Sequence, residues 1–366
     1  MRRRSVDTEI VLRLLSLAAF VMLGACISLS LPEEPMTADG DGVTTTAPDA
    51  DPSGRHVPPV ITLNDHVVVP VLMRPITLTA TVTDDGLGDA PLRFSWRRRS
   101  GPADVLPLPP DAAATQVTFK VAGLYAFEFT VFDGQETVSA MVEVEVLDLE
   151  DRLIAHWPFD DQGNLATDVS GQSGRALALH DTRWQGGAIR GALSLNGGMD
   201  WGEVLGAQAA SFAFNTGDFA VSLWVRTKQR TLASQVPQIV RYAGDSATGY
   251  HGWELSLGVN GFLELKLSEA GQTTGVGRAG LNDNAWHHVV GQRRSGELQF
   301  WIDTKFLAQR SAPFAILEGD GLIVGGGIYG DTTNFDGAVD DLRIFSRALS
   351  DREIAALGNA ALVAQW

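Results

Sequence analysis

The side chains that could do acid–base chemistry are spread along this sequence rather than grouped in motifs. Retaining hydrolysis of a glycosidic bond needs two carboxyl groups about 5–5.5 Å apart. Glu254 and Glu264 flank a predicted hairpin, but each stands alone in its strand, so we interpret both as solvent-facing residues. The Gly-x-Ser-x-Gly motif of a nucleophilic serine does not occur. The sequence therefore assigns no catalytic residues and predicts a protein that is not an enzyme.

The best candidate for chemistry is a calcium site. Asp340 alternates in phase with Leu342 and Ile344, which predicts that it points into the core. A buried carboxylate needs a cation or several hydrogen-bond donors. The loop that begins at Asp168, with acidic residues upstream at 160–161, offers the oxygen ligands that Ca²⁺ prefers. We expect Asp168 and Asp340 to bind Ca²⁺; capping of Asp340 by backbone N–H groups and an arginine is the alternative.

Histidines and aromatic residues give weaker signals. His287 and His288 are adjacent in a predicted strand and so face opposite ways, which does not form a zinc pair. Surface aromatics hold sugars in many proteins, and four candidates lie in loops or on the polar side of strands: Trp184, Trp201, Trp224 and Tyr250. Packing is the alternative role for each of them, and the ligand-binding residues stay open.

Net charge excludes one class of function. The chain carries a formal charge of −16 at pH 7. A protein of this charge gains nothing from the neutralisation of phosphates that dominates nucleic-acid binding. We therefore expect no nucleic-acid partner, and the charge itself favours solubility.

Cys26 is the only cysteine, so no disulfide can form within the chain. Arg2 to Arg4 form a basic segment, and residues 14–25 are apolar apart from one serine, which is too short a run to span a bilayer. This pattern is typical of a signal peptide over residues 1–25. An uncleaved anchor, or an ordinary signal peptide with an incidental cysteine, is the alternative.

The end of that segment, Leu23-Gly24-Ala25-Cys26, resembles the bacterial lipobox. The resemblance implies cleavage before Cys26 and attachment of diacylglycerol to its sulfur, so the first expected partner is a membrane. Ile27 is not the aspartate that retains such proteins at the inner membrane. We therefore expect an exported, lipid-anchored protein at the outer membrane or cell surface of a Gram-negative bacterium.

Residues 26–59 show no periodicity and are rich in Pro, Asp, Thr and Ala, which predicts a disordered tether. Short strands with turn signals between them then fill residues 60–148, as in a small sandwich. The segments Phe94-Ser95-Trp96, Ser100-Gly101-Pro102, residues 123–127 and Asp133-Gly134 occur there in order. They resemble the PKD-type immunoglobulin-like domain, which implies a non-catalytic spacer. We expect Trp96 in its core.

Residues 152–358 contain about a dozen predicted strands without βαβ alternation, which favours a large antiparallel sandwich or jelly roll. Asn260-Gly261 marks a hairpin. Ser350 to Glu353 form a capping box that predicts one short C-terminal helix. The expected fold class is all-β, with a small immunoglobulin-like sandwich followed by a larger one.

The larger segment carries a second resemblance. Its residues Ala155-His156-Trp157-Pro158-Phe159-Asp160, 218–225, Trp286-His287-His288 and 336–350 are similar to the LamG-like, concanavalin A-like lectin/glucanase superfamily. The resemblance implies a concanavalin A-like jelly roll, and the family's frequent structural calcium agrees with the site expected above. The family commonly has Asp-Gly where this chain has Asp303-Thr304, so we expect a different or strained turn there.

Three functions compete. The first is a membrane-anchored, surface-displayed binding module that recognises a glycan or a surface protein through its LamG-like domain. The second is a structural or assembly protein of the cell envelope with no soluble ligand. The third, and weakest, is a cryptic polysaccharide hydrolase. The sequence does not indicate the oligomeric state.

Overall fold

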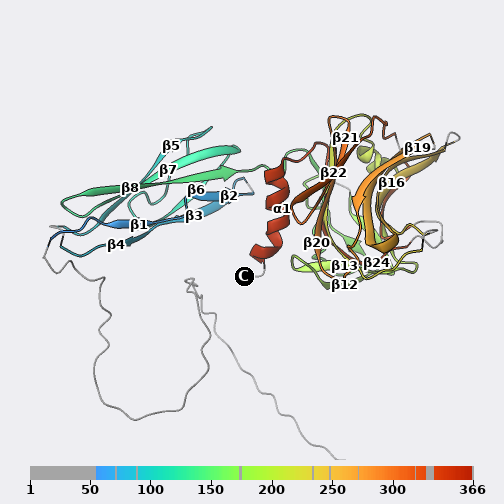
Figure 1. Ribbon diagram of the computed structural model, residues 1–366, viewed down its shortest axis with the longest axis horizontal. Coiled ribbons are helices and arrows are strands. Elements are labelled where there is room, and N and C mark those ends of the chain that lie inside the picture. Colours follow the sequence, from blue (N-terminus) through green and yellow to red (C-terminus); the bar gives the residue numbers. More distant parts are fainter. Residues whose placement is uncertain are drawn as a thin grey trace, which may run out of the picture. The chain divides into compact units, whose positions relative to one another are not determined.

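A computed structural model shows the fold of the chain (Figure 1). It describes residues 55–364, except 71, 88–89, 173–174, 233–234, 247–248, 271, 318 and 327–333; for 245–246, 249–250 and 361–364 it describes the backbone alone. Cys26, the expected signal peptide and most of the expected tether lie outside the described residues. Within the described part, no helix combines the length and apolar character needed to cross a membrane.

The N-terminal domain is a small all-β sandwich. Its four-stranded sheet has the order β2-β8-β7-β5, and two strand pairs, β1-β4 and β3-β6, complete it. The eight strands are β1 (Val60–Thr62), β2 (His66–Val69), β3 (Pro75–Thr79), β4 (Thr81–Thr83), β5 (Arg93–Ser100), β6 (Ala114–Thr118), β7 (Gly123–Phe132) and β8 (Thr137–Val146).

Alternating apolar residues build the core of this domain. Tyr125, Phe127 and Phe129 on β7 are fully buried, and Trp96 is 3% exposed. Trp96 packs against Phe129 with ring centroids 4.7 Å apart, and its Nε1 donates to the carbonyl of Ala112 at 3.0 Å. The expectation that Trp96 is a core residue is confirmed, because both ends of its side chain are satisfied inside the sandwich.

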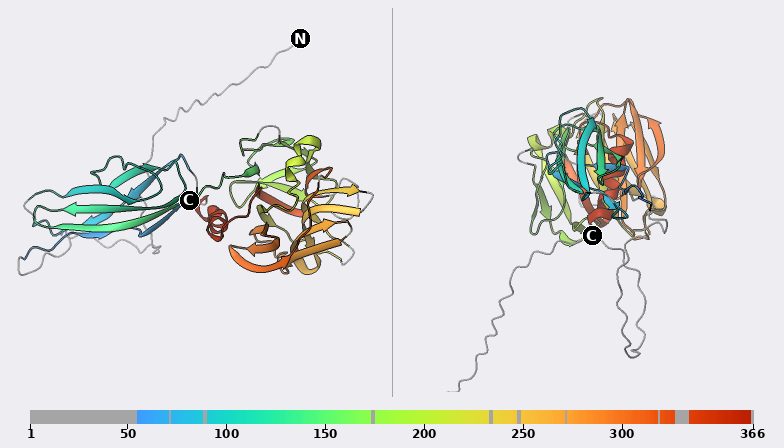
Figure 2. Two further views of the ribbon diagram at one scale, coloured as in Figure 1. Left: turned by 90° about the horizontal axis from the view of Figure 1, so that it is seen from above. Right: turned by 90° about the vertical axis from the view of Figure 1, so that its left-hand side faces the viewer.

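The C-terminal domain is a larger antiparallel sandwich of two sheets that face each other (Figures 1 and 2). The front sheet has the order β10-β11-β14-β23-β16-β17-β18-β19. Its strands are β10 (Leu165–Ala166), β11 (Leu177–His180), β14 (Trp201–Leu205), β16 (Gln238–Ser246), β17 (Gly249–Gly258), β18 (Phe262–Glu269), β19 (Gln272–Arg278) and β23 (Gly321–Val324).

The back sheet has the order β12-β13-β24-β15-β20-β21-β22, and β9 pairs with β24 beside it. Its strands are β9 (Leu153–Trp157), β12 (Arg183–Gly186), β13 (Gly191–Asn196), β15 (Phe219–Arg226), β20 (His287–Arg294), β21 (Glu297–Ile302), β22 (Lys305–Ser311) and β24 (Asp336–Phe345). Apolar residues from both sheets form one buried cluster between them. The described fold is thus the all-β class that the sequence predicts.

Two hairpin turns contain left-handed residues. Asn260 and Gly261 have φ of 57° and 69° between β17 and β18, as the Asn-Gly pair predicts. Asp303 and Thr304 have φ of 49° and 66° between β21 and β22. A β-branched residue is strained in this region, so the expected strained turn is present at Thr304.

Helix α1 (Asp351–Ala364) covers the outer face of the back sheet. Ser350 Oγ accepts from the backbone N–H of Glu353 at 3.3 Å, and Glu353 Oε2 accepts from that of Ser350 at 2.7 Å, which confirms the capping box. Ile354 and Leu357 pack onto the sheet beside Phe345. The helix continues past residue 358, where we expected the domain to end.

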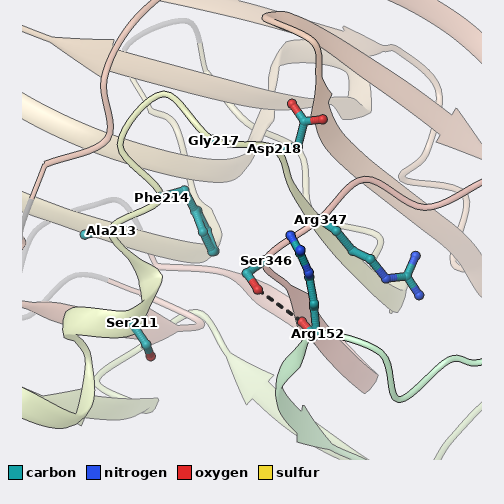
Figure 3. Close-up of a pocket in the computed structure, with 8 residues that line it drawn as sticks. All are labelled: Arg152, Ser211, Ala213, Phe214, Gly217, Asp218, Ser346 and Arg347. Carbon is teal, nitrogen blue, oxygen red and sulfur yellow. Dashed lines mark hydrogen bonds between the residues drawn. The ribbon is translucent and has the colours of Figure 1, made fainter.

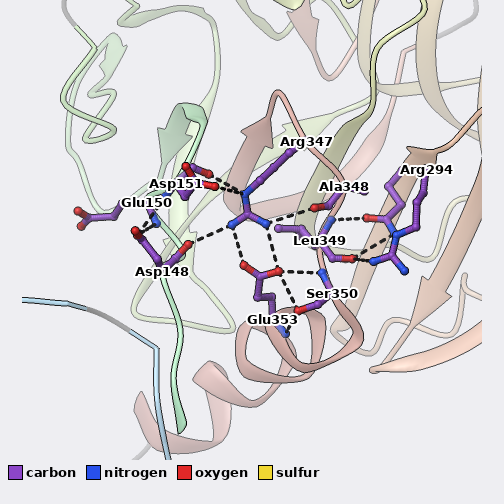
Figure 4. Close-up of polar contacts among 10 residues, drawn as sticks. Asp148, Glu150, Asp151, Arg294, Arg347, Ala348, Leu349, Ser350 and Glu353 are labelled. Carbon is purple, nitrogen blue, oxygen red and sulfur yellow. Dashed lines mark hydrogen bonds and ion pairs between the residues drawn. The ribbon is translucent and has the colours of Figure 1, made fainter. Parts of the chain in front are cut away.

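An arginine ties the start of this helix to the segment before β9 (Figure 4). The Arg347 guanidinium lies 2.7 Å from Glu353 Oε1 and donates to the carbonyls of Asp148 at 3.0 Å and Asp151 at 2.8 Å. One half-buried charge therefore contacts both the helix N-terminus and the joint that leads into the larger sandwich.

Candidate functional site

The outer face of the front sheet carries a row of charged side chains. The apolar residues of β16, β17 and β18 enter the core, so the residues that alternate with them lie on the opposite face. Arg241, Glu254, Lys266 and Gly275 are direct cross-strand neighbours in this row. The row places opposite charges side by side on adjacent strands, which stabilises the sheet.

Lys266 joins two carboxylates in this row. Its Nζ lies 3.4 Å from Glu254 Oε1 and 3.0 Å from Glu264 Oε1. Gln238 Nε2 donates to Glu254 Oε2 at 3.1 Å, and Arg241 Nη1 donates to Gln238 Oε1 at 3.1 Å. Five polar side chains of three strands therefore form one connected network.

The network is packed rather than loosely solvated. Glu254 is 8% exposed, so our interpretation of it as a solvent-facing residue is wrong. Its cross-strand neighbours Arg241 and Lys266 lie beside it, and glycine at the next position of the row, Gly275, leaves room for the Glu264 carboxylate. Ser256, on the same face, is fully buried, and its Oγ has no hydrogen-bond partner within the described part of the chain.

This geometry fits binding better than hydrolysis. Two carboxylates held within reach of one ammonium, with amide and guanidinium groups beside them, can accept and donate hydrogen bonds to a hydroxyl-rich ligand. A retaining glycosidase needs one of its two carboxyls to carry a proton. Lys266 instead ion-pairs with both Glu254 and Glu264.

An aromatic group lies on the same sheet at β11 and β14. His180 and Trp201 are cross-strand neighbours whose rings stack, with centroids 4.4 Å apart and planes at 20°. Glu203 Oε1 is 2.9 Å from His180 Nε2 and holds this pair. Among the candidates whose side chains are described, Trp201 is therefore the one whose ring belongs to a polar cluster on this sheet.

The other aromatic candidates differ in their surroundings. Trp224 is 8% exposed and packs against His288, so its role is packing. Trp184 packs partly against the core, and its Nε1 donates to the carbonyl of Gly163 at 3.0 Å. The side chain of Tyr250 lies outside the described part.

Asp340 is fully buried, but on the opposite face from the one we predicted. The predicted alternation fails because β24 contains a bulge, at which Asp341 has a φ of 47°. Val339 and Leu342 on either side enter the core, whereas Asp340 lies opposite Trp224 on the outer face. Because of the bulge, Asp340 lies on the outer face, although Leu342 and Ile344 of the same strand enter the core.

The surroundings of Asp340 leave one of its carboxylate oxygens without a described partner. Oδ2 accepts from the backbone N–H of Ile189 at 2.8 Å, and Oδ1 has no partner among the described residues. Burial, together with the nearby charges of Asp341 and Asp160, raises the pKa of Asp340 to about 8. A carboxylate that is costly to ionise when alone becomes favourable beside a bound ion.

Asp168 lies elsewhere, at the edge of β9 that faces away from β24. Its Oδ1 accepts from the backbone N–H groups of His156 and Ser170, both at 2.9 Å, and its Oδ2 is buried without a described partner. No described contact joins it to Asp340. The described residues contain no group of three or more His, Cys, Asp or Glu side chains arranged for a metal.

His287 and His288 face opposite ways, as expected. His287 contacts Asp283 and Asp303 near the surface. His288 is 2% exposed, and burial lowers its pKa to about 4. Its Nε2 lies 2.9 Å from Ser222 Oγ. This serine–histidine pair, which sequence reasoning missed, is sealed from substrate because Ser222 is 1% exposed.

Comparisons with known families agree with the two domains. Residues 202–355 match the model described as "Concanavalin A-like lectin/glucanases superfamily". Residues 64–146 match a model of the PKD domain. No curated protein matches the chain.

Solved structures similar to the chain include receptor-binding domains of bacterial toxins. The binding domain of Paraclostridial Mosquitocidal Protein 1 is 18% identical with a TM-score of 0.47, over 58% of this chain and 53% of that one. The binding domain of botulinum neurotoxin serotype D is 17% identical with a TM-score of 0.46, over 58% of this chain and 52% of that one. The same domain in complex with N-acetylneuraminic acid is 18% identical with a TM-score of 0.46, over 57% of this chain and 51% of that one. The chain thus spans about half the length of these proteins.

Proposed function

We propose that this chain is a lipid-anchored surface protein whose larger domain is a non-catalytic carbohydrate-binding module. Cys26 carries the lipid, residues 26–59 provide reach, and the PKD-like domain is a spacer. The outer face of the front sheet contacts the glycan. A surface protein as ligand is the alternative outcome of the tests below.

One observation supports this assignment above the others: the packed network of Gln238, Arg241, Glu254, Glu264 and Lys266. Its hydrogen-bonding groups are held in place before any ligand arrives, so binding does not require their ordering.

Calcium belongs to the proposal as a structural ion at Asp340. Asp160 acts on Asp340 through its charge, and its Oδ1 already accepts from the backbone N–H of Gly191 at 2.8 Å. Asp168, the second ligand that the sequence predicts, also has an unpartnered oxygen, but no described contact joins it to Asp340. The ion would supply the positive charge that the buried carboxylate of Asp340 lacks.

The test is a glycan array probed with the mature chain in Ca²⁺ and in chelator, alongside Trp201→Ala. We expect a restricted set of glycans to bind and the Trp201 variant to bind them less. A blank array together with one specific co-purifying protein would show that the ligand is a protein. Hydrolysis of a polysaccharide panel that Glu254→Gln abolishes would show instead that the domain is an enzyme.

A further inference from the structure

A cavity of about 470 Å³ lies where β9 and β15 begin (Figure 3). Its residues differ from those of the front-sheet network, and they come from the segments before β9 and β15 and from the segment that follows β24. Ligand sites commonly have volumes of roughly 300–1,000 Å³. The groups that line it are Arg152, Ser211, Ala213, Phe214, Gly217, Asp218, Ser346 and Arg347.

One wall of this pocket is the loop before β15, and a buried arginine holds it. Arg293 is 1% exposed and donates to the carbonyls of Gly217 at 2.8 Å, Asn215 at 2.6 Å and Phe314 at 2.7 Å. Phe214 stacks on a core ring 4.7 Å away with planes at 5°. These contacts hold the wall in place, and Phe214 lines the cavity while only 9% of it is exposed.

The opposite wall contains two arginines with different roles. The Arg347 guanidinium points away from the cavity, into the network of Figure 4. Arg152 projects into the cavity beside Phe214 (Figure 3), and no acidic partner for it occurs among the described residues. Its backbone is held in the left-handed region, with φ of 52°, where its carbonyl accepts from the Ser346 N–H at 2.9 Å. A strained backbone at a cationic side chain that faces a cavity is typical of a ligand site.

The remaining polar groups define what would bind. Asp218 Oδ1 accepts from the backbone N–H of Ser295 at 2.8 Å, which fixes this carboxylate at the rim as a hydrogen-bond acceptor. Ser346 adds a hydroxyl. A ligand must therefore offer a carboxylate to the Arg152 guanidinium, with which it can form paired hydrogen bonds, and hydroxyl donors to Asp218.

We propose that this pocket binds the carboxylate of an acidic saccharide, such as a sugar acid within an oligosaccharide. A polyanion is disfavoured, because the chain's net charge of −16 repels it and only one cation faces the cavity. An acidic peptide also offers a carboxylate to Arg152 and backbone N–H donors to Asp218, so it is the competing ligand that the test below includes. The proposal rests on the proposed carbohydrate-binding function and adds a second surface to it.

Calorimetric titration of the mature chain with sialyllactose and with lactose, which lacks the carboxylate, tests the proposal. We expect sialyllactose to bind at least tenfold more tightly than lactose. Arg152→Gln keeps a side chain at the left-handed position and should lose that difference. Arg278→Gln, at an exposed position on β19, is the matched control and should retain it. Unchanged melting of both variants confirms that they fold.

The outcomes separate this proposal from the proposed function. Equal affinities for the two saccharides would overturn the proposal that this pocket binds a carboxylate. The same affinity difference in the two variants would overturn it as well. So would tighter binding of an acetylated tri-glutamate peptide that Arg152→Gln abolishes. Glycan binding that depends on the front sheet and not on Arg152 would overturn only the proposal for this pocket. Failure of all glycans to bind would overturn both this proposal and the proposed carbohydrate-binding function.

Discussion

Lys266 neutralises two carboxylates on a face where the side chains are only 10–19% exposed. Replacing it with methionine keeps the length of the side chain but removes the ammonium group that contacts both Glu254 and Glu264. We expect Lys266→Met to lower the free energy of unfolding by about 1–3 kcal/mol. Lys305→Met, at an exposed position on β22, should change it by less than about 0.5 kcal/mol. Urea unfolding of the purified chain measures both.

Asp340 should make stability depend on pH. Its pKa is about 8 in the folded chain and about 3.9 in an unfolded one. Between these values the folded state binds the extra proton, so stability falls as pH rises, by on the order of 1.4 kcal/mol per pH unit. Above pH 8 both states are ionised and the dependence ends.

Urea unfolding in chelator at pH 7, 7.5 and 8 measures this slope, because below about pH 6.5 the lowered pKa of His288 adds a slope of opposite sign. Asp340→Asn should flatten it, because the amide does not titrate. Calcium should stabilise the wild-type chain more at pH 8 than at pH 5, since the ion replaces the proton. A calcium effect of equal size in the Asp340 variant would show that the ion binds elsewhere.

The orientation of Asp340 shows what residue patterns omit. Alternation with Leu342 and Ile344 correctly indicated burial, but it assumed an unbroken strand. The left-handed Asp341 inserts one residue, and nothing in the residue types marks that bulge. The pairing of Glu254 with Glu264 through Lys266 was hidden for a related reason: it depends on cross-strand register, which only the folded sheet reveals.

At the scale of elements, the contact between helix α1 and the back sheet depends on one glycine. A Cβ at Gly358 would lie 2.5 Å from Thr304 Cγ2 and 2.8 Å from His288 Nδ1. Gly358→Ala should therefore destabilise the domain by about 1–3 kcal/mol, although alanine favours helix. Asn359→Ala, at the next and exposed position, should instead stabilise it by about 0.5 kcal/mol. A stabilising Gly358→Ala in thermal unfolding would contradict this packing.

Elements with local signals were predictable from sequence. Asn260 and Gly261 occupy left-handed positions that few residue types adopt, and Ser350 accepts a hydrogen bond from a free N–H group at the helix N-terminus, which few side chains can do. The pocket around Arg152 was not predictable, because its walls lie some sixty and two hundred residues apart in sequence and meet only through tertiary packing. Turns and helix caps can be predicted from neighbouring residues in the sequence. A site formed by distant segments can be recognised only once the fold is known.

At the scale of the whole molecule, the proposed anchor at Cys26 determines where binding takes place. Cys26→Ser removes the only thiol, and with it the predicted acceptor of the lipid. We expect the wild-type chain to partition into detergent and to incorporate labelled palmitate in a bacterial host, and the variant to do neither. Ser28→Ala is the control and should behave as wild type. Labelling of the Cys26 variant would contradict lipidation at this residue.

Glycan recognition by the outer face of the front sheet is the central claim, and a titration with isosteric variants tests it most directly. Glu264→Gln removes one charge from the network, whereas Glu297→Gln removes one from β21 of the back sheet. With a glycan that binds the wild-type mature chain on the array, we predict at least a tenfold loss of affinity for Glu264→Gln and none for Glu297→Gln. Equal affinities for the two variants would contradict the claim.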